Sequence, residues 1–245
     1  MKSNISLEKI DAVVLCGGKG KRLGAITKNI PKPMVMIGKR PFLDILIERI
    51  SSFGLKRFVL CVGYKKEAVK NYFRIHKSSD TAIVFSEEKE GRLLGTAGAI
   101  KNAEGSVKSE AFLVMNGDSF LYLDLERFLK FHNEKKAVVS IVLTKTIKRD
   151  DVGKVRLGKN DEIIAFSEKE VIRDEPYMNA GVYIFDRRVF HYIPQDTSFS
   201  IECDLFPLLV GKGIYGFVVN NDVLDIGTPE RLIKAKVFFS GDHKR

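Results

Sequence analysis

The stretch DAVVLCGGKGKRLGAITKNIPKPM, residues 11–34, decides the fold that we expect for this chain. Its apolar run from Ala12 to Cys16 predicts a buried strand, and the loop that follows is rich in glycine. Glycines let backbone N–H groups approach an anion without obstruction by Cβ atoms, and basic side chains add positive charge. The loop contains Gly17, Gly18, Lys19, Gly20, Lys21 and Arg22. This combination predicts a site for a polyanion, for which phosphate is the natural candidate.

A second basic element follows in the same stretch, where Lys32 stands between Pro31 and Pro33. Proline fixes its own φ and restricts the residue before it, so the amine of Lys32 is presented from a stiff segment. Three interpretations remain open here: a strand and turn with surface lysines, a dinucleotide-binding turn, or a nucleoside-triphosphate site. The second lacks an acidic residue after the next strand, where residues 63–66 read GYKK. The third is not a P-loop, because no Gly-x-x-x-x-Gly-Lys-Ser/Thr occurs.

The composition is that of a soluble globular protein with one large α/β domain. The chain has 245 residues, of which 44% are hydrophobic and 29% charged. No apolar run is long enough to cross a bilayer, and the first residues lack the apolar core of a signal peptide. We therefore expect a cytoplasmic protein, with no membrane partner. We also expect a single domain over residues 1–245, with flexible tails at 1–10 and 240–245.

The charged and thiol-bearing residues narrow the function classes. A net charge of +10 fits either a nucleic-acid-binding protein or an enzyme whose substrates are phosphorylated anions. The basic residues are spread along the chain and no nucleic-acid-binding motif occurs, which favours the enzyme. The three cysteines and four histidines are dispersed, so the sequence supports no zinc site, disulfide or catalytic thiol.

Strand and helix patterns alternate after the glycine loop. Apolar runs predict strands at 57–62, 82–85, 111–115, 137–144 and 163–166, and helical spacing predicts helices at 42–53, 66–75 and 124–134. This alternation is typical of a parallel sheet with helices on both faces, in which ligands bind at the C-terminal ends of the strands. Asp118 follows one of these strands after a glycine, where it would either hold a cation or mark an ordinary turn.

Two motifs together resemble the signature of the sugar-1-phosphate nucleotidyltransferases. Residues 15–23, LCGGKGKRL, are similar to the Gly-Gly-x-Gly-Thr-Arg-Leu pattern, with Lys21 in place of threonine, and residues 31–34 match Pro-Lys-Pro-Met. Further resembling segments follow in the family's order: LGTAG at 94–98, NGD at 116–118, DVGKV at 151–155, EK at 168–169, NAGVY at 179–183 and DIGTP at 225–229. The resemblance implies a Rossmann-like, mostly parallel central sheet with helices on both faces and a small added β region for the sugar.

The resemblance also implies a role for each segment. Arg22 would bind the β- and γ-phosphates of a nucleoside triphosphate, Lys32 the α-phosphate, and Asp118 and Asp225 a Mg²⁺ ion. The nucleotide would lie against Leu15, Gly17, Gly18, Gly20, Lys21, Gly95, Thr96 and Gly117. The sugar phosphate would be bound by Gly153, Glu168, Lys169, Asn179 and Gly181.

Ordinary structural interpretations stand beside these roles. Gly95 and its neighbours could serve a tight helix–sheet contact, the pair at 168–169 could be a solvated surface pair, and Asn179 with Gly181 could form a turn or bulge. Residues 199–202 resemble a capping box ahead of a helix, so we interpret Glu202 as structural. Thr228 is expected to cap the terminal helix that begins at Pro229.

The inferred reaction is nucleotidyl transfer: a sugar 1-phosphate oxygen attacks the α-phosphorus of the triphosphate, and pyrophosphate leaves. Such a reaction needs positioning and charge neutralisation rather than a protein nucleophile. The resemblance favours GTP and D-glycero-α-D-manno-heptose 1-phosphate. Mannose-1-phosphate guanylyl transfer and uridylyl transfer to hexose or N-acetylmuramic acid phosphates are alternatives. A nucleotide-sensing module and a dinucleotide-dependent oxidoreductase are the alternatives from other classes. The family resemblance also favours a homodimer.

Overall fold

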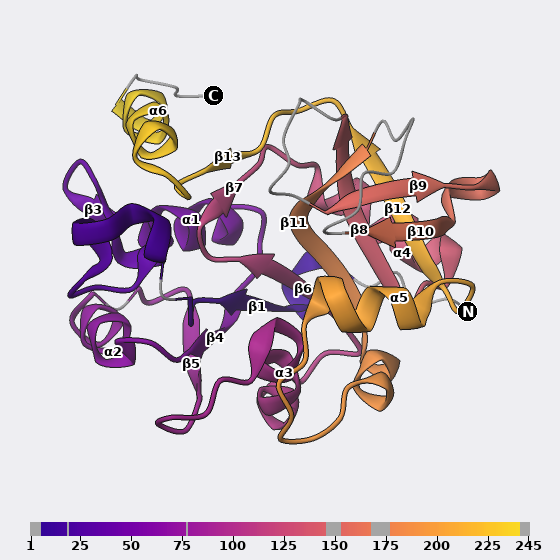
Figure 1. Cartoon of the computed structure of the whole chain (residues 1–245), viewed down its shortest axis with the longest axis horizontal. Helices are drawn as coiled ribbons and strands as arrows, with labels where there is room; N and C mark the ends of the chain where they lie inside the picture. The colour runs from indigo at the N-terminus through magenta and orange to yellow at the C-terminus, as the bar shows by residue number, and fades with distance from the viewer. Residues whose placement is uncertain (1–5, 19, 77, 146–152, 168–176, 241–245) are drawn as a thin grey trace.

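The computed structural model describes residues 6–18, 20–76, 78–145, 153–167 and 177–240. Their largest element is a nine-stranded sheet, in which β6, β1, β4 and β5 run parallel as neighbours in that order (Figure 1). These strands are β1 (Asp11–Leu15), β4 (Arg57–Val62), β5 (Ala82–Glu87) and β6 (Ala111–Asn116). The register pairs the last residue of β1, Leu15, with Cys61 on one side and Asn116 on the other. The C-terminal ends of β1 and β6 therefore lie at the same edge of the sheet.

The other half of the sheet is mixed. Strand β11 (Tyr177–Asp186) runs antiparallel to both β6 and β8 (Val139–Lys145), and β12 (Ile214–Val219) extends the sheet parallel to β8. The hairpin of β9 (Lys154–Leu157) and β10 (Ile163–Ser167) pairs with β11. Two small sheets stand apart from it: β2 (Met36–Ile37) with β3 (Arg40–Pro41), and β7 (Ser119–Phe120) with β13 (Leu224–Asp225). The predicted architecture of a parallel centre with an added β region is confirmed.

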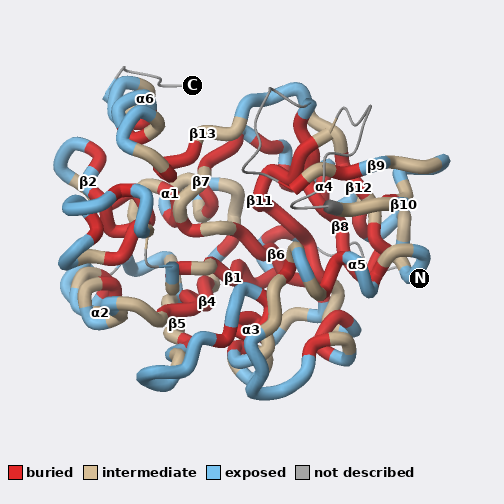
Figure 2. The backbone as a smooth tube through the Cα atoms, viewed as in Figure 1, coloured by how far each residue is buried: buried red, intermediate tan, exposed pale blue. Residues whose placement is uncertain are grey.

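Helices cover both faces of the sheet, as the alternation of apolar residues along β1 requires. Ala12 and Val14 belong to one buried cluster, whereas Val13 belongs to the other. Residues of α1 (Phe42–Ser51), α2 (Lys66–Ile75), α4 (Leu125–Lys135) and α6 (Pro229–Ser240) pack in the first cluster. Residues of α3 (Gly95–Asn102) and α5 (Phe206–Leu209) pack in the second. Figure 2 shows the central strands buried between these layers.

Short helical turns complete the described chain: η1 (Leu7–Lys9), η2 (Lys21–Thr27), η3 (Lys32–Met34), η4 (Glu104–Ser106), η5 (Lys159–Asp161), η6 (Arg187–Tyr192) and η7 (Ile201–Leu205). Leu7 and Ile10 lie within the tail that we expected at residues 1–10, yet both side chains are buried in the core. No helix in the described ranges is both long and apolar enough to cross a membrane.

An aromatic cluster joins the C-terminal helix to the centre of the molecule. Phe238 and Phe239, near the end of α6, lie 6.1 and 5.5 Å from the ring of Phe120 in β7, measured between ring centroids. Phe239 also meets Phe42 of α1 edge to face, at 6.1 Å. Edge-to-face pairs at this separation add attraction beyond the area that they bury. The cluster therefore holds α6 against α1 and β7, and these elements lie together in Figure 1.

Candidate active site

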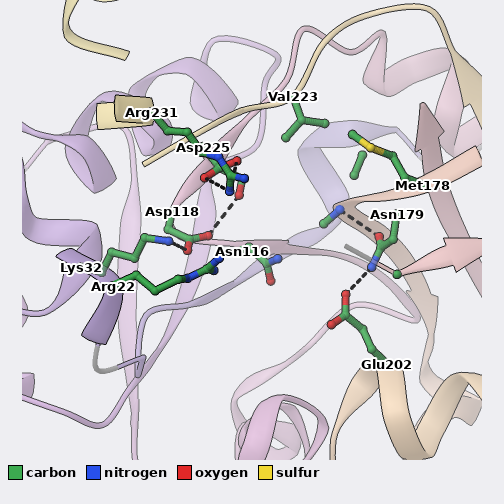
Figure 3. Close-up of a pocket in the computed structure, with 14 residues that line it drawn as sticks. Arg22, Lys32, Asn116, Asp118, Met178, Asn179, Glu202, Val223, Asp225 and Arg231 are labelled. Atoms are coloured by element: carbon green, nitrogen blue, oxygen red, sulfur yellow. Dashed lines mark hydrogen bonds and ion pairs between the residues drawn. The ribbon is translucent and has the colours of Figure 1, made fainter. Parts of the chain in front are cut away.

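A pocket opens at the C-terminal ends of β1 and β6, where β11 crosses from the mixed half of the sheet (Figure 3). Fourteen described residues line it: Arg22, Lys32, Asn116, Asp118, Ser119, Gly153, Met178, Asn179, Ala180, Gly181, Glu202, Val223, Asp225 and Arg231. Seven of them are predicted site residues: Arg22, Lys32, Asp118, Gly153, Asn179, Gly181 and Asp225. Two further predicted site residues, Glu168 and Lys169, lie outside the described residues.

Positive and negative side chains gather at one end of the pocket, which we call the charged end (Arg22, Lys32, Asp118, Asp225 and Arg231). Lys32 is 9% exposed, and its Nζ makes an ion pair with Oδ2 of Asp118. Gly20 packs closely against the side chain of Lys32. The backbone of Gly20 is left-handed, with φ +60°, and a Cβ there would lie 2.9 Å from the Cβ of Lys32. Because Gly20 has no Cβ, the glycine loop leaves room for the side chain of Lys32.

Two carboxylates far apart in the sequence meet at this end because β7 pairs with β13. Asp225 lies opposite Ser119, and the N–H of Ile226 donates to the carbonyl of Asp118 at 3.1 Å. Oδ1 of Asp118 accepts from the Ser119 hydroxyl at 3.1 Å. Oδ1 of Asp225 accepts from the N–H of Gly227 at 2.8 Å. The backbone pairing therefore brings the two aspartates together, and their predicted role as metal ligands stays a prediction.

The donor set fits a magnesium ion that shares its coordination with a ligand. Mg²⁺ is usually bound by one or two carboxylates together with substrate phosphates and water. Asp118 and Asp225 supply two carboxylates, and each already faces a cation, Lys32 and Arg231 respectively. Across the described part of the chain, no three His, Cys, Asp or Glu side chains form a metal-binding group. The site thus suits a metal brought with a phosphate better than an all-protein metal cage.

The opposite end, which we call the amide end (Asn116, Asn179, Gly181 and Glu202), is built on a bulge in β11. The pairing with β8 shifts register between Asn179 and Tyr183, so the interpretation as a bulge is correct. Gly181 has φ +74°, and a Cβ there would lie only 2.6 Å from Nδ2 of Asn116. A glycine is therefore required at this position both for its backbone conformation and for space.

The side chain of Asn179 is held by hydrogen bonds on both sides. Its Nδ2 donates to Oε1 of Glu202 at 2.5 Å and to the hydroxyl of Tyr183 at 2.8 Å. Its Oδ1 accepts from the N–H of Gly181 at 2.9 Å. These contacts point the amide toward Glu202 at the pocket wall, as Figure 3 shows.

The cap that we expected at residues 199–202 is present, but the side chain of Glu202 is not its acid. The cap of η7 is made by Ser200, whose Oγ accepts from the N–H groups of Glu202 and Cys203 at 3.2 and 3.1 Å. The carboxylate that returns to the N–H of Ser200 belongs to Asp204, at 2.7 Å. Because Asp204 completes the cap, the side chain of Glu202 is available to line the pocket. The sequence contained a signal for this arrangement, because a second acid, Asp204, stands two residues after Glu202.

The residues around Gly95 make a close contact within the protein. The N–H of Ile201 donates to Oγ1 of Thr96 at 2.8 Å, and a Cβ on Gly95 would lie 2.7 Å from the carbonyl oxygen of Phe199. The contact joins α3 to the segment that carries Glu202, rather than to the sheet. Nucleotide binding by Gly95 and Thr96 stays a prediction, as it does for the loop residues that do not line the pocket: Leu15, Gly17, Gly18, Gly20, Lys21 and Gly117.

Sequence reasoning missed several lining residues: Asn116, Ser119, Met178, Ala180, Val223 and Arg231. Asn116 and Ser119 flank the Gly117-Asp118 pair, so their nearness to the aspartate was a usable signal. Arg231 lies in the first turn of α6, and nothing in its immediate sequence points to a pocket.

The thiols near the pocket are not suited to nucleophilic chemistry. Cys16 and Cys61 are both buried. Burial raises the pKa of the Cys61 thiol to about 12, and burial, with smaller contributions from Cys61 and Asp118, also raises the pKa of Cys16. Both thiols therefore stay protonated near neutral pH, in keeping with a site that works by charge and position.

Comparison with known proteins places this site in a family. Residues 11–240 match the model of the nucleotidyl transferase family, and the chain belongs to that family. It is 36% identical to a D-glycero-α-D-manno-heptose 1-phosphate guanylyltransferase of Campylobacter jejuni, over 90% of this chain and 96% of that protein. The crystal structure of HddC from Yersinia pseudotuberculosis complexed with GMP-PN superimposes with a TM-score of 0.80 at 30% identity, covering 94% of this chain and 99% of that chain.

Longer relatives share the same domain. The chain is 34% identical to a mannose-1-phosphate guanylyltransferase of Mycobacterium tuberculosis, over 94% of this chain but 64% of that protein. It is also 34% identical to a UTP–glucose-1-phosphate uridylyltransferase of Synechocystis, over 60% of that protein. The chain thus spans somewhat less than two thirds of these two curated relatives.

Proposed function

We propose that this chain transfers a guanylyl group from GTP to D-glycero-α-D-manno-heptose 1-phosphate, with Mg²⁺, and releases pyrophosphate. The observation that carries the proposal is the charged end of the pocket, where two carboxylates, Lys32 and Arg22 converge at the C-terminal edge of the sheet. The choice of GTP and a heptose phosphate rests on two relatives of matching length that are named as guanylyltransferases for this sugar phosphate, from Campylobacter jejuni and Aneurinibacillus thermoaerophilus.

In this reaction an oxygen of the sugar 1-phosphate attacks the α-phosphorus of GTP, and the bond from that phosphorus to the bridging oxygen breaks. The attacking phosphate is already an anion near neutral pH, so the protein need not remove a proton. Mg²⁺, which Asp118 and Asp225 would hold, would screen the repulsion between the two anionic reactants. Arg22 would bind the departing β- and γ-phosphates, and Lys32 would neutralise charge at the α-phosphate.

The two ends of the pocket give the sugar phosphate a direction. Its phosphate would face the charged end, and its hydroxyls would face the amide end, where the carboxylate of Glu202 can accept hydrogen bonds. Asn179 already donates to Glu202, so we assign it the task of orienting that carboxylate beside any contact with the sugar. Gly153 and Gly181 would leave room for the ring, and the predicted roles of Glu168 and Lys169 complete the proposed set.

The nucleotide would lie on the glycine loop. A Cβ on Gly18 would meet no atom of the described residues within 4 Å, so they leave space for a ligand beside that backbone. The proposed nucleotide contacts remain those of the resemblance: Leu15, Gly17, Gly18, Gly20, Lys21, Gly95, Thr96 and Gly117.

We also propose a cytoplasmic location and a homodimer. The mass in solution, measured by light scattering, tests the homodimer.

Pyrophosphate release tests the proposal directly. The assay would combine the protein, Mg²⁺ and each of the four common nucleoside triphosphates with a panel of sugar 1-phosphates. Release with GTP and D-glycero-α-D-manno-heptose 1-phosphate alone would support the full proposal. Release with GTP and mannose 1-phosphate would instead support the activity named for the Mycobacterium tuberculosis relative. No release from a folded protein that binds GTP would contradict nucleotidyl transfer and favour a sensing module.

A further inference from the structure

Four side chains at the charged end alternate in sign. Lys32 pairs with Asp118, and Arg231 pairs with Asp225. The two ion pairs approach each other at Gly227. A Cβ on Gly227 would lie 2.7 Å from Oδ1 of Asp225, 3.3 Å from Nζ of Lys32 and 3.5 Å from Nη1 of Arg231. Both cations therefore approach the same stretch of backbone, beside the carboxylates that we propose as metal ligands.

Two contacts of Asp225, with Gly227 and with Arg231, differ in length. Its Oδ1 accepts from the N–H of Gly227 at 2.8 Å, a full hydrogen bond. Nη1 of Arg231 lies 3.3 Å from Oδ1 and 3.4 Å from Oδ2. Charge-assisted N–H to carboxylate bonds are usually about 2.7–2.9 Å long. The backbone thus fixes the carboxylate, while the guanidinium straddles both oxygens loosely, as a counterion does.

The helix keeps this guanidinium near Asp225. Thr228 caps α6, because its hydroxyl accepts from the N–H of Arg231 at 3.3 Å and its carbonyl accepts from the N–H of Leu232 at 2.9 Å. Leu232 and Ala235 are buried and anchor the helix in the core. Arg231 therefore projects from a fixed first turn. A second cation that arrives at Asp225 therefore has to displace the guanidinium from the carboxylate.

We propose that Arg231 is a positioning residue that competes with the divalent metal for Asp225 and thereby sets the metal concentration at which the site fills. The inference rests on the proposed function, since it takes Asp225 as a metal ligand. In this arrangement Arg231 balances the charge of the carboxylate while no metal is bound. A metal ion that binds Asp225 then replaces the guanidinium.

Metal binding without turnover tests the inference. Mn²⁺ would be titrated into the full chain, with no nucleotide or sugar phosphate, and the free ion followed by electron paramagnetic resonance. Because Arg231→Gln removes the competing charge, we expect its Mn²⁺ dissociation constant to fall about three- to tenfold. Arg231→Lys keeps the charge and should stay close to the wild type. Arg188→Gln is the matched control, because it breaks a pair with Asp186 that does not line the pocket.

The outcomes separate this inference from the proposed function. If Asp225→Asn leaves Mn²⁺ binding unchanged, the metal assignment itself is wrong. If Asp225→Asn abolishes binding but Arg231→Gln binds Mn²⁺ as the wild type does, or more weakly, the competition is overturned. Should Arg231→Gln fail to fold, Arg231→Met serves instead, since it keeps the apolar stem and loses the charge.

A kinetic readout distinguishes competition from a merely structural role. Competition lowers the Mg²⁺ concentration that gives half-maximal turnover in Arg231→Gln. A structural role lowers the melting temperature and the rate at every Mg²⁺ concentration, and that result would overturn the inference.

Discussion

At the charged end of the pocket the side chains come from five separate segments, and ion pairs join them. The segments are the turns η2 and η3, the turn between β6 and β7, the strand β13 and the first turn of α6. At the amide end the side chains come from the end of β6, from inside the long strand β11 and from the turn η7. There hydrogen bonds join Asn179 to Glu202 and to the bulged backbone at Gly181. We therefore expect the two ends to have different roles. Changes at the charged end should affect the chemistry more than the fold, whereas changes at the amide end should affect stability and sugar binding together.

The strongest test of this expectation concerns the two aspartates. Asp118→Asn and Asp225→Asn each keep the shape of the side chain but remove a charge that we assign to Mg²⁺. We expect turnover with saturating Mg²⁺ to fall about 10³-fold, with little change in melting temperature. Asp161→Asn is the control, because Asp161 pairs with Lys135 away from the pocket. Near-normal rates for both pocket variants would contradict the metal assignment.

Lys32→Ala should show the next largest effect. Its amine is held against Asp118 from a nearly buried position, so the variant lacks a fixed positive charge where we place the α-phosphate. We expect kcat to fall about 10²-fold, measured by pyrophosphate release. A variant that loses stability but keeps its kcat would show that Lys32 is a structural residue.

At the amide end, Gly181→Ala should destabilise the protein by about 1–3 kcal/mol, since it forces alanine into a left-handed conformation against Asn116. Urea unfolding would measure the free energy. Gly18→Ala is the matched control, because the backbone of Gly18 is not left-handed and a Cβ there would meet no atom within 4 Å among the residues that the structure describes. An equal free energy of unfolding for both variants would contradict the proposal that the bulge at Gly181 stabilises the fold.

Glu202→Gln should have the smallest effect of the four. The substitution keeps an acceptor for the amide of Asn179 but weakens hydrogen bonds from sugar hydroxyls. We expect the KM for the sugar phosphate to rise about tenfold, while the KM for GTP stays unchanged. An equal rise in both constants would show that Glu202 does not act on the sugar selectively.

The same contrast explains what could be predicted from the sequence. The strands at 57–62 and the helix at 66–75 were predicted to the residue, because their apolar patterns are local. Arg22, Lys32 and Asp118 were found because each follows a strand or sits in a linear motif. Glu202 and Arg231 were not, because their place depends on how a cap is completed and how a helix docks. Neither arrangement leaves a periodic signal in the chain.

The aromatic cluster has a consequence for where this chain can be cut or extended. Phe120 follows Asp118 by two residues, and its ring packs on Phe238 and Phe239 near the end of α6. Trimming the chain before Phe238 would therefore expose the ring near Asp118, which we propose as a metal ligand, although the cut lies in the last turn of a surface helix. A fusion partner or affinity tag joined directly after Phe239 would press on the same contact. Partners attached through a flexible spacer beyond residue 240 should leave it intact.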